Sequence, residues 1–108
     1  MRYKGVVTKE GLKDEGFLNF ATDLREENGY IHFTADTDFA PAIVSEMKEA
    51  LKTGPYYAVI KTEYELNIIF AEKVVTAKPT ETEPIAKAIQ YGVSLEIPES
   101  ELRAQTGI

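Results

Sequence analysis

Hydrophobic and polar residues alternate near the start of the chain, which predicts β-structure there. In "RYKGVVT", residues 2–8, Tyr3, Gly5 and Val7 share one side, and mostly charged or polar residues share the other. A period of two is typical of a strand with one buried face. We therefore expect a first strand here, followed by a solvated loop over 9–16, which is rich in glycine and charge.

The next alternating segments predict a β-hairpin. "FLNFATDL", residues 17–24, is the first arm, and "YIHFTA", residues 30–35, is the return arm. Between them, "REENG" over 25–29 is a polar turn that ends in Asn-Gly, a strong hairpin signal. In the return strand, Ile31, Phe33 and Ala35 share the face that we expect to be buried.

Residues 38–54, "DFAPAIVSEMKEALKTG", change to the periodicity of a helix. Apolar residues recur at intervals of three and four and form one stripe, which contains Ala40, Ile43, Val44, Met47, Ala50 and Leu51. Thr37 or Asp38 can cap the first turn, and Gly54 followed by Pro55 predicts the end.

The second half of the chain predicts two further strands and a helix. Residues 56–62 and 66–75 are rich in aromatic and β-branched side chains, and 83–92 shows a second apolar stripe, with Gly92 as its expected stop. Residues 93–97 are a candidate last strand, and 98–105 a final helical turn or two. The predicted class is α+β: a mainly antiparallel sheet in the order β-β-β-α-β-β-α, with the helices packed on one face because each has one apolar stripe.

Composition fits one domain spanning residues 1–108. The chain is 44% hydrophobic, which suits a packed core, and it has no cysteine for disulfides or thiolate metal sites. Its longest unbroken apolar run, residues 56–60, is too short for a membrane span or a signal-peptide core. We therefore expect a cytoplasmic protein that does not contact a membrane.

Charge argues against a nucleic-acid-binding protein. The net charge is −6, and each half of the chain contributes −3, with no cluster of Lys or Arg along the sequence. Nucleic-acid affinity comes mainly from clustered cations. One alternative function is an acidic inhibitor that imitates nucleic acid, which would need its carboxylates massed on one face.

The only histidine lies in "IHFTADTDF", residues 31–39. In a strand, His32, Thr34 and Asp36 point away from the apolar face, so a small-molecule or metal site around His32, Asp36 and Asp38 is one alternative. Metal-binding histidines usually come with further histidines or cysteines, and aspartates are also favoured at turns and helix starts. We prefer the structural interpretation and predict no metal and no cofactor.

Catalytic signatures are missing from the sequence. The three serines, Ser45, Ser94 and Ser100, lie outside any G-x-S-x-G context, and no glycine-rich phosphate loop occurs. We therefore predict a protein that is not an enzyme.

Tyrosines suggest a binding surface instead. Tyr56, Tyr57 and Tyr64 lie within nine residues, and Tyr30 with His32 forms a second group. Tyrosine is enriched in protein interfaces because it buries a large area at a small entropic cost. The sequence therefore favours a small non-enzymatic protein-binding or assembly module, whose partner is another protein or a second copy of the chain.

Overall fold

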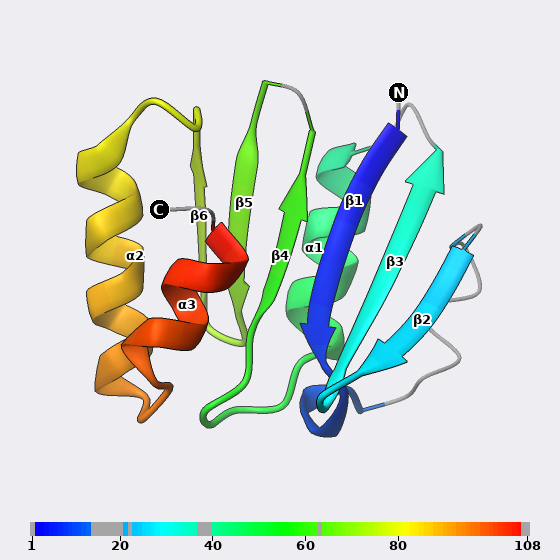
Figure 1. Ribbon diagram of the computed structural model, residues 1–108, viewed down its shortest axis with the longest axis horizontal. Helices are drawn as coiled ribbons and strands as arrows, with labels where there is room; N and C mark the ends of the chain where they lie inside the picture. The colour runs from blue at the N-terminus through cyan, green and yellow to red at the C-terminus, as the bar shows by residue number, and fades with distance from the viewer. Residues whose placement is uncertain (1, 14–20, 22, 37–39, 63, 107–108) are drawn as a thin grey trace.

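Six antiparallel strands form one sheet in the computed structural model, which describes residues 2–13, 21, 23–36, 40–62 and 64–106. The order across the sheet is β2-β3-β1-β4-β5-β6 (Figure 1). These strands are β1 (Arg2–Thr8), β2 (Asp23–Glu27), β3 (Tyr30–Asp36), β4 (Ala58–Lys61), β5 (Leu66–Phe70) and β6 (Lys73–Ala77). The helices described are the 3-10 helix η1 (Lys9–Gly11) and the α-helices α1 (Ala40–Ala50), α2 (Thr82–Ser94) and α3 (Glu99–Thr106). The α+β class and the antiparallel sheet are confirmed.

The helices cover both faces of the sheet, so the prediction that they pack on one face is wrong. From α1, Ile43, Met47 and Leu51 enter one hydrophobic core. From α2 and α3, residues such as Ile89 and Leu102 enter a second core on the opposite face. Figure 1 shows α1 behind the sheet and α3 in front of it. Each face has its own layer of helices.

The two central strands explain why both faces need a cover. All of Ala58–Ile60 in β4 and all five residues of β5 are buried. Successive residues of a strand point to opposite faces, so these strands are apolar on both sides. One layer of helices would leave half of their side chains in water.

A two-residue turn joins β2 to β3. Asn28 and Gly29 both have positive φ, 54° and 83°, as a type I′ hairpin turn requires. The expected five-residue turn over 25–29 is therefore too long, because 25–27 belong to β2. Most of the predicted first arm, 17–20 and 22, lies outside the described residues.

The stretch 66–75 was predicted as one strand, and it forms two. β5 ends at Phe70, and residues 71–72 turn the chain into β6. This tight turn contains Ala71 and Glu72, so no glycine, asparagine or proline marks it in the sequence. The sheet thus gains a sixth strand.

The first predicted helix is present but shorter than expected. α1 ends at Ala50 rather than near Gly54, because the chain then pairs with the segment after β1. The Lys13 N–H donates to the Ala50 carbonyl at 2.9 Å, and the Lys52 N–H donates to that of Gly11 at 2.7 Å. The cap candidates, Thr37 and Asp38, lie outside the described residues.

Gly92 does not stop the second helix, which continues to Ser94. A Cβ at Gly92 would lie 2.6 Å from Leu102 Cδ1, so glycine is what lets α3 pack closely against α2. α2 then ends in a Schellman motif: the Ile97 N–H donates to the Gly92 carbonyl at 3.1 Å, and Glu96 has a φ of 71°. The predicted strand over 93–97 is therefore wrong. No helix in the described ranges is long and apolar enough to cross a membrane.

Candidate functional site

Polar side chains form a regular grid on one face of the sheet. Residues directly opposite in antiparallel strands share a face, with Cβ atoms about 5 Å apart. The register therefore gives one row of Asp23, Thr34, Lys4 and Lys61. The adjacent row contains Arg25, His32, Val6 and Val59. Side chains from four strands thus converge on the same side as α3.

This part of the sheet has no helix over it in the described structure. α2 and α3 pack on β4, β5 and β6, and Figure 1 shows no helix in front of β2 and β3. We call the uncovered surface the open face; it is lined by Lys4, Asp23, Arg25, His32 and Thr34, with Lys61 and Gln105 along its border to α3.

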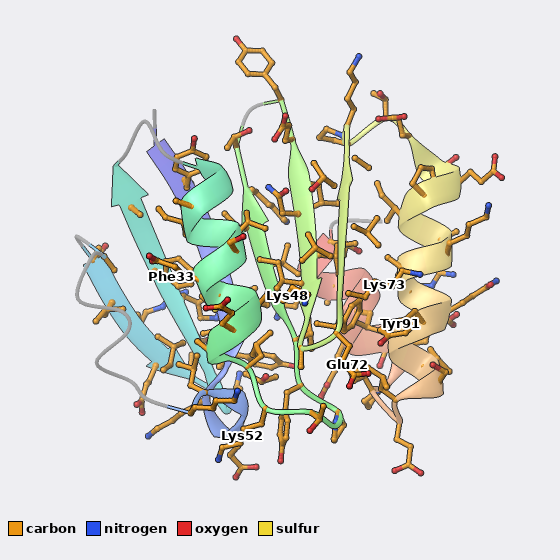
Figure 2. The ribbon with its side chains drawn as sticks, turned by 180° about the vertical axis from the view of Figure 1, so that it is seen from behind. Phe33, Lys48, Lys52, Glu72, Lys73 and Tyr91 are labelled. Atoms are coloured by element: carbon orange, nitrogen blue, oxygen red, sulfur yellow. The ribbon has the colours of Figure 1, made fainter. Side chains whose placement is uncertain are left out.

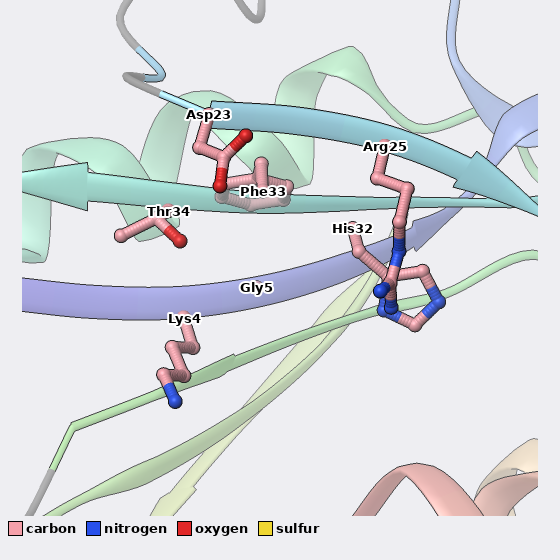
Figure 3. A pocket seen from close by; sticks show the side chains of 7 residues that line it. All are labelled: Lys4, Gly5, Asp23, Arg25, His32, Phe33 and Thr34. Atoms are coloured by element: carbon pink, nitrogen blue, oxygen red, sulfur yellow. The ribbon is translucent and has the colours of Figure 1, made fainter.

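Two adjoining hollows occupy the open face. The larger, of about 430 Å³, lies over β1, β2 and β3 (Figure 3). The smaller, of about 150 Å³, lies between the sheet and Gln105 of α3. Lys4, Gly5 and His32 line both, so the two hollows are parts of one groove. A groove of this size can hold a small molecule.

Cationic groups dominate the groove. Lys4 and Lys61 lie directly opposite each other on β1 and β4. Among the side chains that the structure describes, none forms an ion pair with either ammonium group. Figure 3 shows Lys4 extending from β1 toward β4. Burial lowers the pKa of Lys61, because a partly desolvated ammonium is less stable in its charged form.

Arg25 has a partner, but a weakly held one. Its guanidinium lies 3.3 Å from a carboxylate oxygen of Glu27, and the two side chains are 68% and 53% exposed. Exposed pairs of this kind contribute little to stability. The guanidinium can therefore exchange Glu27 for another anion at small cost.

His32 lies in the middle of the open face. It is half-buried, and its direct neighbours across the strands are Arg25 and Val6. A cationic neighbour does not suit a metal ligand, and no group of three His, Asp or Glu residues in the described ranges could hold a metal ion. The alternative site of His32 with Asp36 and Asp38 is not tested, because Asp38 and the side chain of Asp36 lie outside what the structure describes.

Tyr30 and Tyr57 form an edge-to-face and hydrogen-bonded pair beside the groove. Their rings meet edge to face with centroids 6.1 Å apart, and the Tyr57 hydroxyl donates to the Tyr30 hydroxyl at 3.2 Å. Burial raises the pKa of both phenols, and the nearby Glu101 carboxylate raises both further. Tyr57 is only 1% exposed, so it is a core residue against which Tyr30 packs.

The other two predicted tyrosines lie apart from the groove. Tyr56 and Tyr57 belong to opposite cores, as their adjacency predicts, and both faces are covered there. Tyr56 also lines, with Tyr30, a separate hollow of about 360 Å³ near Glu101. Tyr64 is 68% exposed in the connection between β4 and β5, so it lies at the other end of β4 from Tyr56 and Tyr57.

His32 and Tyr30 were named from the sequence and lie on the same face of β3, but the cations around His32 were not named. Lys4 and Arg25 occupy polar positions of alternating strands, a signal that the sequence did contain. What it could not supply was the register, which places β2, β3, β1 and β4 side by side. Lys61 and Gln105 join the groove only through that arrangement.

The structure is that of a small α+β protein. Its six-stranded antiparallel sheet lies between helices, and the open face is the polar part of the sheet that no described helix covers. Comparison of the chain with protein-family models, curated proteins and solved structures finds no match.

Proposed function

We propose that this chain is a non-enzymatic binding module that holds a small polar ligand in the groove of the open face. The observation that carries this proposal is the convergence of polar side chains from β1, β2, β3 and β4 on two adjoining hollows. The absence of cysteine from the sequence supports a cytoplasmic location as part of the same proposal.

The chemistry of the groove supports binding rather than catalysis. A histidine that acts as a general base is normally oriented by an acid and placed beside a nucleophile. Here the residue opposite His32 on β2 is Arg25. Ser45 is exposed on α1, which packs on the other face of the sheet, and Ser94 donates to the Tyr91 carbonyl on α2.

A protein partner or a second copy is the second candidate, and one observation favours it. β2 is an edge strand, all five of its residues are exposed, and Leu24 is 53% exposed. An edge strand can pair with a strand of another chain. Size-exclusion chromatography with light scattering, compared between the wild type and Leu24→Lys, tests this candidate; a monomer at high concentration contradicts self-assembly.

The ligand proposal is tested by following backbone amide signals in NMR spectra of the isotope-labelled protein. The probes are sodium pyrophosphate, citrate, glucose, spermidine and magnesium chloride. We expect at least one probe to shift amides of β1, β2 and β3 around His32, with saturation. Shifts confined to another part of the molecule, or no saturable shift with any probe, would contradict the proposal.

A further inference from the structure

The opposed lysines of the groove are the starting point for a statement about ligand chemistry. Two like charges directly opposite each other on paired strands are destabilising. Lys4 and Lys61 lie directly opposite each other on β1 and β4, and Lys61 is also partly desolvated. An anion placed between them would remove this cost.

The remaining polar groups of the groove are also suited to an anion. Arg25 can offer a planar pair of N–H donors, which fits phosphate or carboxylate oxygens. His32 adds a ring N–H, and Gln105 adds an amide from α3. Among the described residues that line the two hollows, Asp23 is the one acid.

The contrast between the groove and the whole molecule limits the size of the anion. The chain has a net charge of −6, whereas the groove has Lys4, Lys61 and Arg25 against Asp23. A long polyanion such as a nucleic acid would meet repulsion beyond the groove. A small anion would contact only its cationic interior.

We propose that the open face binds a small anion that bears two or more phosphate or carboxylate groups, held between the opposed lysines and the Arg25–His32 pair. This inference rests on the proposed binding function and names the class of its ligand.

The test is calorimetric titration at low ionic strength, with pyrophosphate and citrate as probes and glucose as the neutral comparison. Pyrophosphate and citrate distinguish a phosphate ligand from a carboxylate ligand. We expect at least one of the two anions to bind, and the double variant K4M/K61M to bind it at least about 10-fold more weakly, because the variant loses two charged hydrogen-bond donors. Arg25→Gln should weaken binding in the same direction.

The matched control is K48M/K52M, which removes the same charge from a hollow near the end of α1 (Figure 2). α1 packs on the other face of the sheet, so the affinity of this control for the anion should be within about 2-fold of the wild-type affinity. Any remaining difference would reflect long-range electrostatics alone. Thermal unfolding of each variant checks that it is folded, and Arg25→Gln remains informative if the double variant is not.

The outcomes separate the two proposals. If neither anion binds, or if K48M/K52M weakens binding as much as K4M/K61M does, the anion inference is overturned. If glucose or spermidine shifts amides of the open face while both anions fail to bind, the binding function stands and only the ligand class is wrong. If no probe reaches the open face, both proposals fail.

Discussion

The two faces of β3 have opposite chemistry within seven residues. On one face, Ile31 and Phe33 are 5% and 3% exposed under α1. On the other face, His32 and Thr34 are half-buried and border the groove. The difference arises because α1 covers one side of β3, whereas Figure 1 shows no helix over the other side of that strand. The offset between the two layers of helices, more than the strand itself, creates the site.

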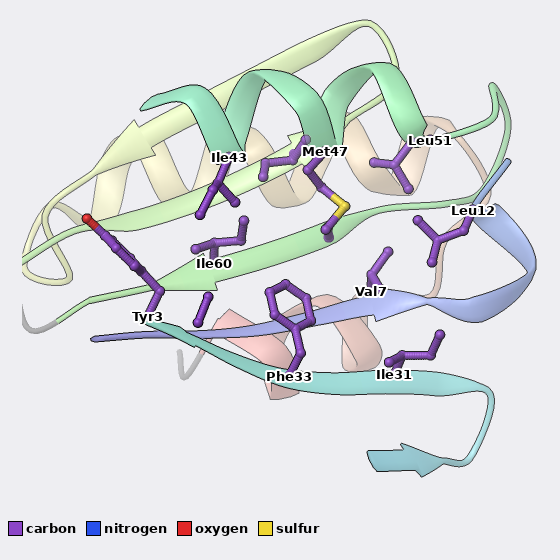
Figure 4. Packing of buried hydrophobic residues seen from close by; sticks show 12 residues of the cluster. Tyr3, Val7, Leu12, Ile31, Phe33, Ile43, Met47, Leu51 and Ile60 are labelled. Atoms are coloured by element: carbon purple, nitrogen blue, oxygen red, sulfur yellow. The ribbon is translucent and has the colours of Figure 1, made fainter. Parts of the chain in front are cut away.

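Of the substitutions that test this comparison, Phe33→Ala should lower the free energy of unfolding the most. Phe33 fills the core under α1 (Figure 4), and removing its ring should lower the free energy of unfolding by about 3–5 kcal/mol. His32→Ala, one position away, should change it by less than about 0.5 kcal/mol. Urea denaturation measures both, and equal costs would contradict the assignment of the two faces.

Gly5→Ala tests how tightly the closed face is packed. Gly5 lies directly opposite Phe33, and a Cβ there would lie 2.1 Å from Phe33 Cζ. Overpacking of this kind should cost about 1–3 kcal/mol. In a double-mutant cycle, Phe33→Leu should recover part of the cost by shortening the side chain; strictly additive costs would show that the two residues do not contact each other.

Tyr57→Phe tests the support beneath the open face. Loss of the hydroxyl should cost about 0.5–1.5 kcal/mol, because Tyr57 donates a partly buried hydrogen bond to Tyr30.

The raised pKa of both phenols means that the folded state keeps them protonated. Their stabilising effect is complete below the ordinary tyrosine pKa of about 10 and is lost as the pH rises above it, by up to about 1.4 kcal/mol per pH unit for each tyrosine. As the pH rises above about 10, the unfolding free energy of the variant should therefore fall less steeply than that of the wild type. Equal slopes would contradict this.

Lys61→Met has the smallest expected effect, and it is a gain. The substitution removes the repulsion with Lys4 and the desolvation of the ammonium, so the variant should be more stable by less than about 1 kcal/mol. Because folding lowers the pKa of Lys61, its charged form costs stability below the folded-state pKa, and the cost fades as the pH rises through that value. The gain should therefore be present at neutral pH and shrink at alkaline pH. A variant less stable than the wild type would show that Lys61 has a stabilising partner.

Periodicity was enough to predict much of the fold. The alternation in β1 and β3 and the stripes of α1 and α2 follow from the side-chain pattern, and Asn28-Gly29 marked its hairpin. The turn after Phe70 was missed because Ala71 and Glu72 have no turn preference. The cover on both faces was not predicted. Its signal in the sequence is the continuous apolar character of β4 and β5, which requires burial on both sides.

The site was predictable only in part, for a related reason. Local alternation places His32 and Tyr30 on the polar side of β3. Pairing between distant segments brings Lys4 to Lys61 and Arg25 to His32, and no local pattern encodes such a register. The large apolar ring that is typical of interface residues also favours burial, and Tyr57 lies in the core.

The close approach of Gly92 and Leu102 sets the distance between α2 and α3. Gln105 is on α3, so this contact also positions one of the residues that line the smaller hollow. A methyl group at position 92 would push α3 outward and widen the gap. The position of a residue in the proposed groove would thus depend on a contact between two helices outside the groove, and a substitution at Gly92 could alter the groove without changing any residue that lines it.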